Sequence, residues 1–290
     1  MAKTRDIRRR IKSVASTMKI TRTMEMVATV RSKKAQEKLR GALPFCEQLA
    51  EMTGRLVEAG EGASHPLFRA APRVKRAAVL AITSDRGLCG GYNANVIAAA
   101  KAEVLRLRAE GIEVEFDVAG KKGVSYFRFL GWELHATHVG IDDRVKYETV
   151  EPMAQAYIER FQAEALDEVR VVGFRYRSST AQKLSVFRLL PVERPALGTG
   201  AGKNAWFEFL PSPEAILSAL VPFEVKTALF TRFLEAGASE QISRRVAMKL
   251  ATDNAEEMRK ILKQKYNRAR QTQITMELSD IMGGVAAVKG

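Results

Sequence analysis

The first sixty residues repeat apolar and polar positions with the period of an α-helix. Apolar side chains at Ile7, Ile11, Val14 and Met18 follow a 4-3-4 spacing, which places them on one stripe of a helix. Thr4 is the candidate N-cap, with Asp6 in the first turn. We therefore expect a long helix, kinked at Gly41 and Pro44, whose apolar stripe continues through Met24, Val27, Ala28, Ala35 and Leu39.

Short apolar runs alternate with helical patterns between residues 61 and 210. Strands are expected near residues 77–82, 113–118, 133–139, 168–176 and 183–190. Helices are expected over residues 93–110, shortly after Gly120, and over 147–166. Strands that alternate with helices predict a parallel or mixed sheet covered by helices, which is a Rossmann-like α/β domain.

The last eighty residues again have the pattern of a long helix. Ser212, Pro213 and Glu214 form a good start, because they supply a cap, a proline at the first position and an acid in the first turn. The pattern continues to Met282, with kinks expected at Pro222 and Gly237. Helices of this length are not stable alone in water unless their apolar faces are packed. We therefore predict an α/β protein in which the N-terminal helix (1–60) and the C-terminal helix (211–290) pair as a long antiparallel coiled coil, with the globular domain in 61–210.

The two ends carry all of the net charge of +14. Residues 1–41 hold 13 Lys or Arg against 3 Asp or Glu, residues 241–290 hold 10 against 5, and residues 42–240 hold 24 against 25. This field attracts an acidic partner, which can be a nucleic acid, a lipid headgroup or a protein.

Several classes of protein are excluded by composition. No apolar run approaches the roughly 20 residues needed to cross a bilayer. The start, MAKTRDIRRR, lacks the apolar core of a secretory signal. Cys46 and Cys89 are the only cysteines, so neither a disulfide framework nor a cysteine zinc cluster is available, and a reducing compartment is expected.

The sequence offers only weak candidates for a catalytic or cofactor-binding site. The segment from Asp85 to Gly91 follows an expected strand, but it matches neither GxGxxG nor a phosphate loop, so we interpret it as a tight turn that holds Cys89 as a small apolar residue. Residues 198–203 are closer to a phosphate loop, although the first glycine is one position out of place and Asn204 replaces the magnesium-binding hydroxyl. His135 and His138 would lie on opposite faces of a strand. We expect no catalytic site, no cofactor and no metal.

The end of the chain has the pattern of a docking segment. Residues 263–273 are polar on nearly every side of a helix, and such a helix either bridges solvent or needs partners. Small and apolar residues follow up to Val288, where a free chain end would normally fray. We therefore expect another protein to sheathe this tip.

These segments resemble the gamma subunits of F-type ATP synthases, in the order found in that family and over the whole chain. The matching motifs are Ile7–Val14, Met18–Ala28, Ser84–Asn93, Arg244, Val246–Lys249, Ala251–Asn254, Tyr266–Gln271 and Ile274–Ala286. Val285 stands where the family usually has alanine, and the region from Arg194 to Phe209 matches poorly.

The resemblance implies a non-catalytic central-stalk rotor that couples proton flow to ATP synthesis and hydrolysis and regulates both. One such subunit turns inside a hexamer of alpha and beta subunits, beside epsilon and on the membrane ring of c subunits. It implies a peripheral protein on the cytoplasmic face of the bacterial inner membrane. Carried over by motif, the contacts to beta subunits would be Arg8, Arg9, Lys12, Met24, Arg31, Lys33, Arg244, Arg268, Arg270, Gln271, Thr275 and Glu277.

Two other functions can be distinguished from this one. A nucleic-acid-binding protein with two basic arms would interleave stacking aromatics, but the arms hold little beyond Phe45 and Tyr266. A cofactor-binding α/β enzyme would need the missing glycine fingerprint, and nucleotide would raise its melting temperature.

Overall fold

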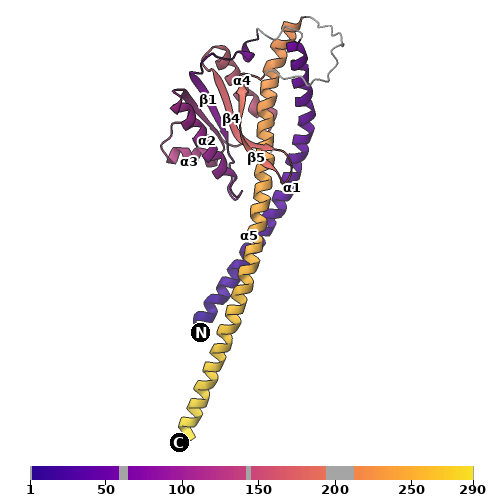
Figure 1. Ribbon diagram of the computed structural model, residues 1–290. Helices are drawn as coiled ribbons and strands as arrows, with labels where there is room; N and C mark the ends of the chain where they lie inside the picture. Colours follow the sequence, from indigo (N-terminus) through magenta and orange to yellow (C-terminus); the bar gives the residue numbers. More distant parts are fainter. Residues whose placement is uncertain (1, 59–64, 142–144, 194–211, 290) are drawn as a thin grey trace. The chain divides into compact units, whose positions relative to one another are not determined.

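A computed structural model describes residues 2–58, 65–141, 145–193 and 212–289. The chain divides into two compact units, one of residues 29–243 and one of residues 1–28 with 244–290. Helix α1 (Ala2–Glu58) and helix α5 (Pro213–Lys289) each supply residues to both units (Figure 1).

The unit of residues 29–243 contains a five-stranded mixed sheet in the order β3-β2-β1-β4-β5. Its strands are β1 (Arg76–Ile82), β2 (Glu113–Ala119), β3 (Ala136–His138), β4 (Glu168–Tyr176) and β5 (Gln182–Leu190). The first four are parallel, and β5 returns antiparallel to β4. The sequence prediction of a Rossmann-like α/β domain is therefore confirmed.

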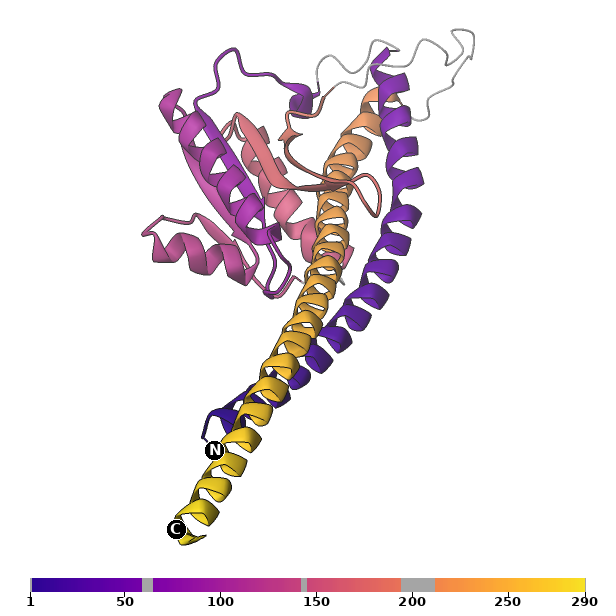
Figure 2. The ribbon, with the colours of Figure 1, turned by 60° about the horizontal axis from the view of Figure 1, so that its bottom comes forward.

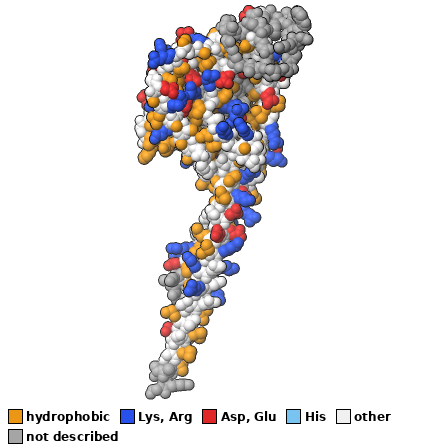
Figure 3. Space-filling model, viewed as in Figure 1, with side chains coloured by type: hydrophobic (Ala, Val, Ile, Leu, Met, Phe, Trp, Pro, Cys, Tyr) orange, Lys and Arg blue, Asp and Glu red, His pale blue; other side chains and the backbone are white. Residues whose placement is uncertain are grey.

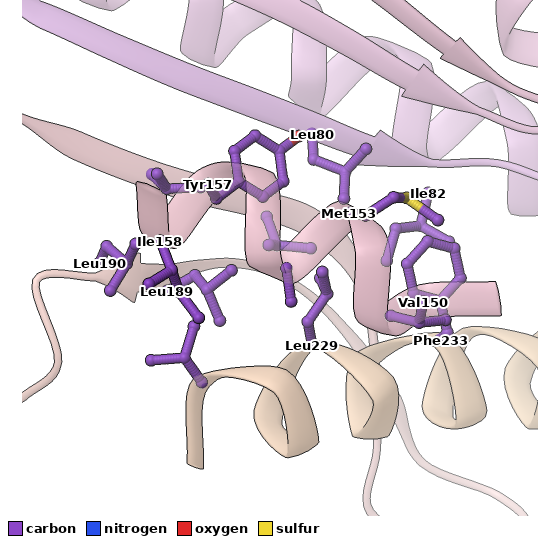
Figure 4. Close-up of a cluster of buried hydrophobic side chains, with 14 of the residues drawn as sticks. Leu80, Ile82, Val150, Met153, Tyr157, Ile158, Leu189, Leu190, Leu229 and Phe233 are labelled. Atoms are coloured by element: carbon purple, nitrogen blue, oxygen red, sulfur yellow. The ribbon is translucent and has the colours of Figure 1, made fainter. Parts of the chain in front are cut away.

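Helices cover both faces of this sheet. Helix α2 (Tyr92–Ala109) and helix α3 (Lys121–Phe129) pack against Ala77, Val79 and Ala81 of β1. The alternate residues Leu80 and Ile82 face helix α4 (Tyr147–Gln162) and helix α5 (Figure 4), and residues of α1 belong to the same buried cluster. Because β1 is apolar at every position from Ala77 to Ile82, it suits a strand that is buried on both sides.

Helices α1 and α5 run antiparallel within each unit. In the unit of residues 29–243, Cys46 Sγ of α1 lies 3.1 Å from Thr231 Oγ1 of α5. In the other unit, Thr21 Oγ1 lies 2.9 Å from Thr252 Oγ1, and Thr4 donates to Gln273 Oε1 at 3.1 Å. As residue numbers rise along α1, those of the α5 partners fall, so the predicted antiparallel pairing is confirmed.

The apolar stripe predicted for α1 is found with one exception. Ile7, Ile11, Val14 and Met18 are half-buried, but Val27 is 47% exposed. Val27 lies beside Ala28, which is 1% exposed and takes the inward position at this turn.

The helix ends differ from the sequence predictions in one case and agree in the other. Helix α1 begins at Ala2, so Thr4 is not its cap, and its first turn has no acid. The Thr4 hydroxyl bonds across to α5 instead of to its own backbone. At the start of α5, Ala215 N donates to Ser212 Oγ at 3.3 Å and Pro213 opens the helix, which confirms that prediction.

The glycines and prolines inside the two helices do not end them. Helix α1 continues through Gly41 and Pro44, both exposed, where water can satisfy the carbonyl that a proline leaves free. Helix α5 continues through Pro222 and Gly237 and past Met282 to Lys289. The expected strand near 133–139 is only three residues long. The glycine-rich segment 198–203 lies outside the described residues, and the division into 1–60, 61–210 and 211–290 stays a prediction.

Candidate partner-binding surface

Most of the twelve predicted contact residues are exposed along the two helices. Met24 and Arg31 are half-buried, and Arg244 is an exception at 8% exposure. The others are exposed, namely Arg8, Arg9, Lys12, Lys33, Arg268, Arg270, Gln271, Thr275 and Glu277. Arg31 and Lys33 belong to the unit of residues 29–243, and the remaining ten belong to the other unit.

Some of the predicted residues on α5 contact one another or their neighbours. Thr275 Oγ1 donates to the carbonyl of Gln271 at 3.0 Å, and Gln273 Nε2 donates to Glu277 Oε1 at 2.8 Å. These bonds satisfy side chains locally along the helix. They leave the cationic groups of Arg268 and Arg270 on the exposed surface.

A groove lies where the start of α1 meets α5. Its volume is about 530 Å³, and its lining residues are Thr4, Ile7, Lys265, Arg268, Ala269, Thr272, Gln273 and Met276.

 A second hollow, of about 980 Å³, lies in the unit of residues 29–243 beside His65, Phe68 and Arg188. The groove of about 530 Å³ on the helix pair combines the apolar side chains of Ile7 and Met276 with the cations Lys265 and Arg268. It is therefore suited to a partner segment that is both acidic and apolar.

Helix α5 carries a run of exposed apolar residues beyond Gln273, which is the residue that pairs with Thr4 near the start of α1. Their exposed fractions run from 45% for Ile274 to 72% for Met282, and the others are Met276, Leu278, Ile281 and Val285. In Figure 3 hydrophobic and basic side chains are interspersed along this helix pair. A surface of this kind is typical of a segment that a partner covers.

The sequence analysis missed further exposed apolar residues on the same helices. Ile20 and Met26 of α1 are 59% and 58% exposed, and Leu250 and Met258 of α5 are 57% and 53% exposed. They lie off the inward stripe of their helices. The signal that could have found them is an apolar residue at a position where the helical period predicts a polar one.

The turn after β1 is closed by its own side chains. Asp85 accepts hydrogen bonds from Lys121 N at the start of α3 and from Gly140 N, both at 2.8 Å. A carboxylate therefore occupies the helix N-terminus where a bound phosphate would otherwise be favoured. Leu88 adopts a φ of 63° and is 59% exposed, a feature that the sequence analysis did not predict.

Replacing Asp85 by alanine tests this role. The variant leaves two backbone N–H groups without their carboxylate acceptor, so we expect a loss of about 1 kcal/mol in the free energy of unfolding, the size typical of a lost helix cap. Urea denaturation followed by circular dichroism measures it. Asp85→Asn, which keeps one acceptor oxygen, is expected to lose less; equal losses in the two variants would contradict the assignment.

The two histidines proposed as weak metal candidates lie near one buried carboxylate. His135 precedes β3, so it does not share a strand with His138, and its Nδ1 lies 3.0 Å from Asp117 Oδ1. Tyr157 donates to Asp117 Oδ2 at 2.5 Å, and burial foremost raises the pKa of Tyr157. Burial lowers the pKa of His138, against the opposing effect of Asp117. The expectation that the histidines face opposite sides of one strand was wrong because β3 begins only at Ala136.

The described ranges hold neither a cluster of metal ligands nor a helix suited to cross a membrane. Within them, no group of three or more His, Cys, Asp or Glu is arranged to hold a metal ion. None of the helices in the same ranges combines the length and apolar character that a membrane span requires.

Comparison with known proteins identifies relatives over the full chain. The family model described as ATP synthase matches residues 3–288. The "ATP synthase gamma chain" of Leptospira biflexa is 40% identical over 288 residues, covering 99% of this chain and all of the relative. That of Rhodopirellula baltica is 39% identical over 296 residues, with both chains fully covered. A chain from the cryo-EM structure of Euglena gracilis mitochondrial ATP synthase superposes with a TM-score of 0.67 at 20% identity, covering 99% of this chain and 95% of that one, and so shares its fold.

Proposed function

Because the chain belongs to the ATP synthase family and is related over its whole length to ATP synthase gamma chains, we propose that it is the central-stalk rotor subunit that couples proton flow to ATP synthesis and hydrolysis. It has no catalytic site of its own in this proposal. Its partners are the alpha and beta subunits, epsilon and the c-ring, with one such chain in each complex. It is peripheral to the membrane, on the cytoplasmic face of a bacterial inner membrane.

The observation that carries the proposal is the helix pair of residues 1–28 and 244–290. Hydrogen bonds between Thr4 and Gln273 and between Thr21 and Thr252 join the two helices. The outer faces of both helices are largely polar, so the pair alone does not form a core. The same helices expose Ile20, Met26 and Met282, which a protein sleeve would cover. A paired rod that is both basic and apolar outside suits a shaft enclosed by subunits.

Coupling in this proposal follows from asymmetry. A single chain made of two different helices has no threefold axis, so it presents different faces to three identical beta subunits. Contacts that differ by about 1.4 kcal/mol change a conformational equilibrium tenfold, so modest differences suffice to bias each catalytic site. Rotation of the shaft would then change which subunit is biased toward which state.

The contact residues act together in this proposal. Exposed ion pairs contribute up to about 1 kcal/mol each, so no single exposed cation among Arg8, Arg9, Lys12, Arg268 and Arg270 is expected to be indispensable. Arg244 has little surface available in the chain alone, so its proposed contact would be made by a small part of its side chain. Steric contact with electrostatic guidance is the mechanism that fits this surface.

Single and combined neutralisations of these cations test the distributed contact. We expect each single Arg→Gln change to lower the torque of the assembled complex by less than half, because the remaining contacts persist. Combining Arg8→Gln, Arg9→Gln, Arg268→Gln and Arg270→Gln is expected to reduce torque several-fold. Single-molecule rotation measures both, with Lys101→Gln and Arg128→Gln on the α/β domain as a control for lost charge. Loss of all torque in one single variant would contradict the proposal.

Co-purification tests the proposed role itself. The full chain, tagged and expressed with the alpha and beta subunits of its own operon, is expected to bring down a ring of nucleotide-binding subunits with one tagged chain per ring. Nucleotide alone is expected to leave the melting temperature of the isolated chain unchanged. A tagged chain that recovers no ring, or one stabilised by nucleotide, would argue for a different function.

A further inference from the structure

A buried ion pair lies on α5 within the unit of residues 29–243. Arg232 Nη1 is 2.6 Å from Glu235 Oε2, one turn further along the helix. The two side chains are 17% and 4% exposed. Neither residue is used by the contact surface described above.

This pair also contacts the sheet. The Arg232 guanidinium carbon lies 4.6 Å from the centroid of the Phe187 ring in β5. The backbone N–H of Tyr176, at the end of β4, donates to the Glu235 carboxylate. The β4–β5 hairpin lies beside α5 (Figure 2), and these directional contacts join the two.

The same hairpin is tied to α1. Tyr176 Oη donates to Gln36 Oε1 at 3.0 Å. Arg232 and Glu235 of α5 contact both strands of the hairpin, and Tyr176 of the hairpin contacts Gln36 of α1. Together these contacts connect two helices and two strands of one unit. Arg175 of β4 adds a second cation whose charge acts on both members of the pair.

A gain in the stability of the fold does not explain why this ion pair is buried. Burial is the leading effect on both groups: it raises the pKa of the Glu235 carboxyl and lowers the pKa of the Arg232 guanidinium, so both charged forms are disfavoured by desolvation. Within the described residues, neither Arg232 Nε nor Glu235 Oε2 makes a hydrogen bond, although the two side chains form an ion pair. Apolar residues of similar size often replace such a pair without loss of stability.

The packing of β5 on α5 next to this pair is apolar. Leu189 and Leu190 of β5 lie with Leu229 and Phe233 of α5 in one buried cluster (Figure 4). Apolar packing is strong but non-directional, so it resists separation better than sliding. Fixing one register therefore needs a contact that depends on direction.

We propose that Arg232 and Glu235 are positioning residues that hold the β4–β5 hairpin in a single register on α5, so that the sheet and the two helices of this unit move as one body. The consequence for torque rests on the proposed function, because a rotor whose sheet slid on its helices would lose torque. The register itself is a property of the isolated chain.

Spin-label distances in the full chain test the register. Labels at Ser179→Cys in the hairpin turn and Ala219→Cys on α5, both exposed positions, are introduced in a Cys46→Ser, Cys89→Ala background. That background is expected to give one narrow distance distribution. The Arg232→Met, Glu235→Leu variant is expected to keep its unfolding midpoint in urea but to show a distribution broadened about twofold or split into two.

Leu229→Ala is the matched control, since it weakens the apolar packing and leaves the ion pair intact. It is expected to lower the unfolding midpoint and to keep one narrow distance. If the double variant does not fold, the distance distribution is measured in Glu235→Gln instead, because that change removes the charge while keeping the shape of the side chain. An unchanged distribution in the folded variant overturns the inference, and this result does not depend on whether the chain assembles with a ring, which co-purification decides separately.

Discussion

Replacement of Gly120 by alanine is expected to unfold the α/β domain under conditions where the parent chain is folded. Gly120 follows β2 with a φ of 95°, and an added Cβ would lie 2.2 Å from the carbonyl oxygen of Thr83. Thr83 cannot retreat, because its N–H donates to the carbonyl of Ala119 at 2.8 Å and its hydroxyl donates to the same oxygen at 2.7 Å. The strained backbone and the overpacking together cost about 4 kcal/mol, a large part of the stability of an ordinary domain.

Urea denaturation followed by circular dichroism measures this loss, and Gly111 supplies the matched control. Gly111 also has a positive φ, of 79°, but nothing lies within 4 Å of the Cβ that alanine would add. Gly111→Ala therefore reports the backbone strain alone and is expected to cost about 1 kcal/mol. If the two variants lose equal stability, the close approach of Gly120 to Thr83 is not what requires glycine.

Replacement of Arg170 by methionine is expected to destabilise the same domain by about 3 kcal/mol near neutral pH, because it removes one partner of a buried charge network. Arg170 Nη2 lies 2.7 Å from Glu168 Oε2, and its Nη1 pairs with Glu103. The two carboxylate side chains are only 5% and 10% exposed. Methionine keeps the packing volume but leaves Glu168 without this cation.

The free energy of unfolding that is lost in Arg170→Met should become smaller as the pH falls. Hydrogen bonds from Arg106 foremost, and from Arg170, lower the pKa of Glu103 in the folded chain. A carboxyl whose folded pKa is lowered contributes stability above its unfolded pKa and loses it as pH falls through the folded pKa. Part of that contribution is absent in Arg170→Met, so the difference between parent and variant should narrow below about pH 4.

Urea denaturation over a pH series measures both effects, with Arg188→Met as the control. Arg188 sits opposite Arg170 in the β4–β5 ladder, and its pair with Glu193 is exposed, with side-chain exposures of 45% and 73%. The control is expected to change stability by less than about 0.5 kcal/mol at any pH. If the difference in the free energy of unfolding between the parent and Arg170→Met stays constant down to pH 3, the proposed role of this charge network is contradicted.

The surface was predicted less completely than the helices that carry it. The cations at Arg8, Arg9 and Arg268 were found because a motif and a basic run mark them, and all three are exposed. The exposure of Ile20 and Met26 was not predicted, because a single apolar residue off the stripe is only a weak sign of an exposed position. The burial of Arg244 was not predictable either, since arginine exposure depends on what packs around it.

The amino-acid sequence alone determined the order of helices and strands, because the periods of 3.6 and 2 and the Ser-Pro-Glu helix start are local signals. It also determined that the long helices must find partners, since their apolar faces cannot remain in water. Only the tertiary structure decided that Thr4 bonds to Gln273 instead of capping its helix, that Asp85 closes the turn at α3, and that Arg232 and Glu235 meet Phe187 and Tyr176. Each of these contacts joins residues far apart in the chain, and no local pattern specifies which distant group will be the neighbour.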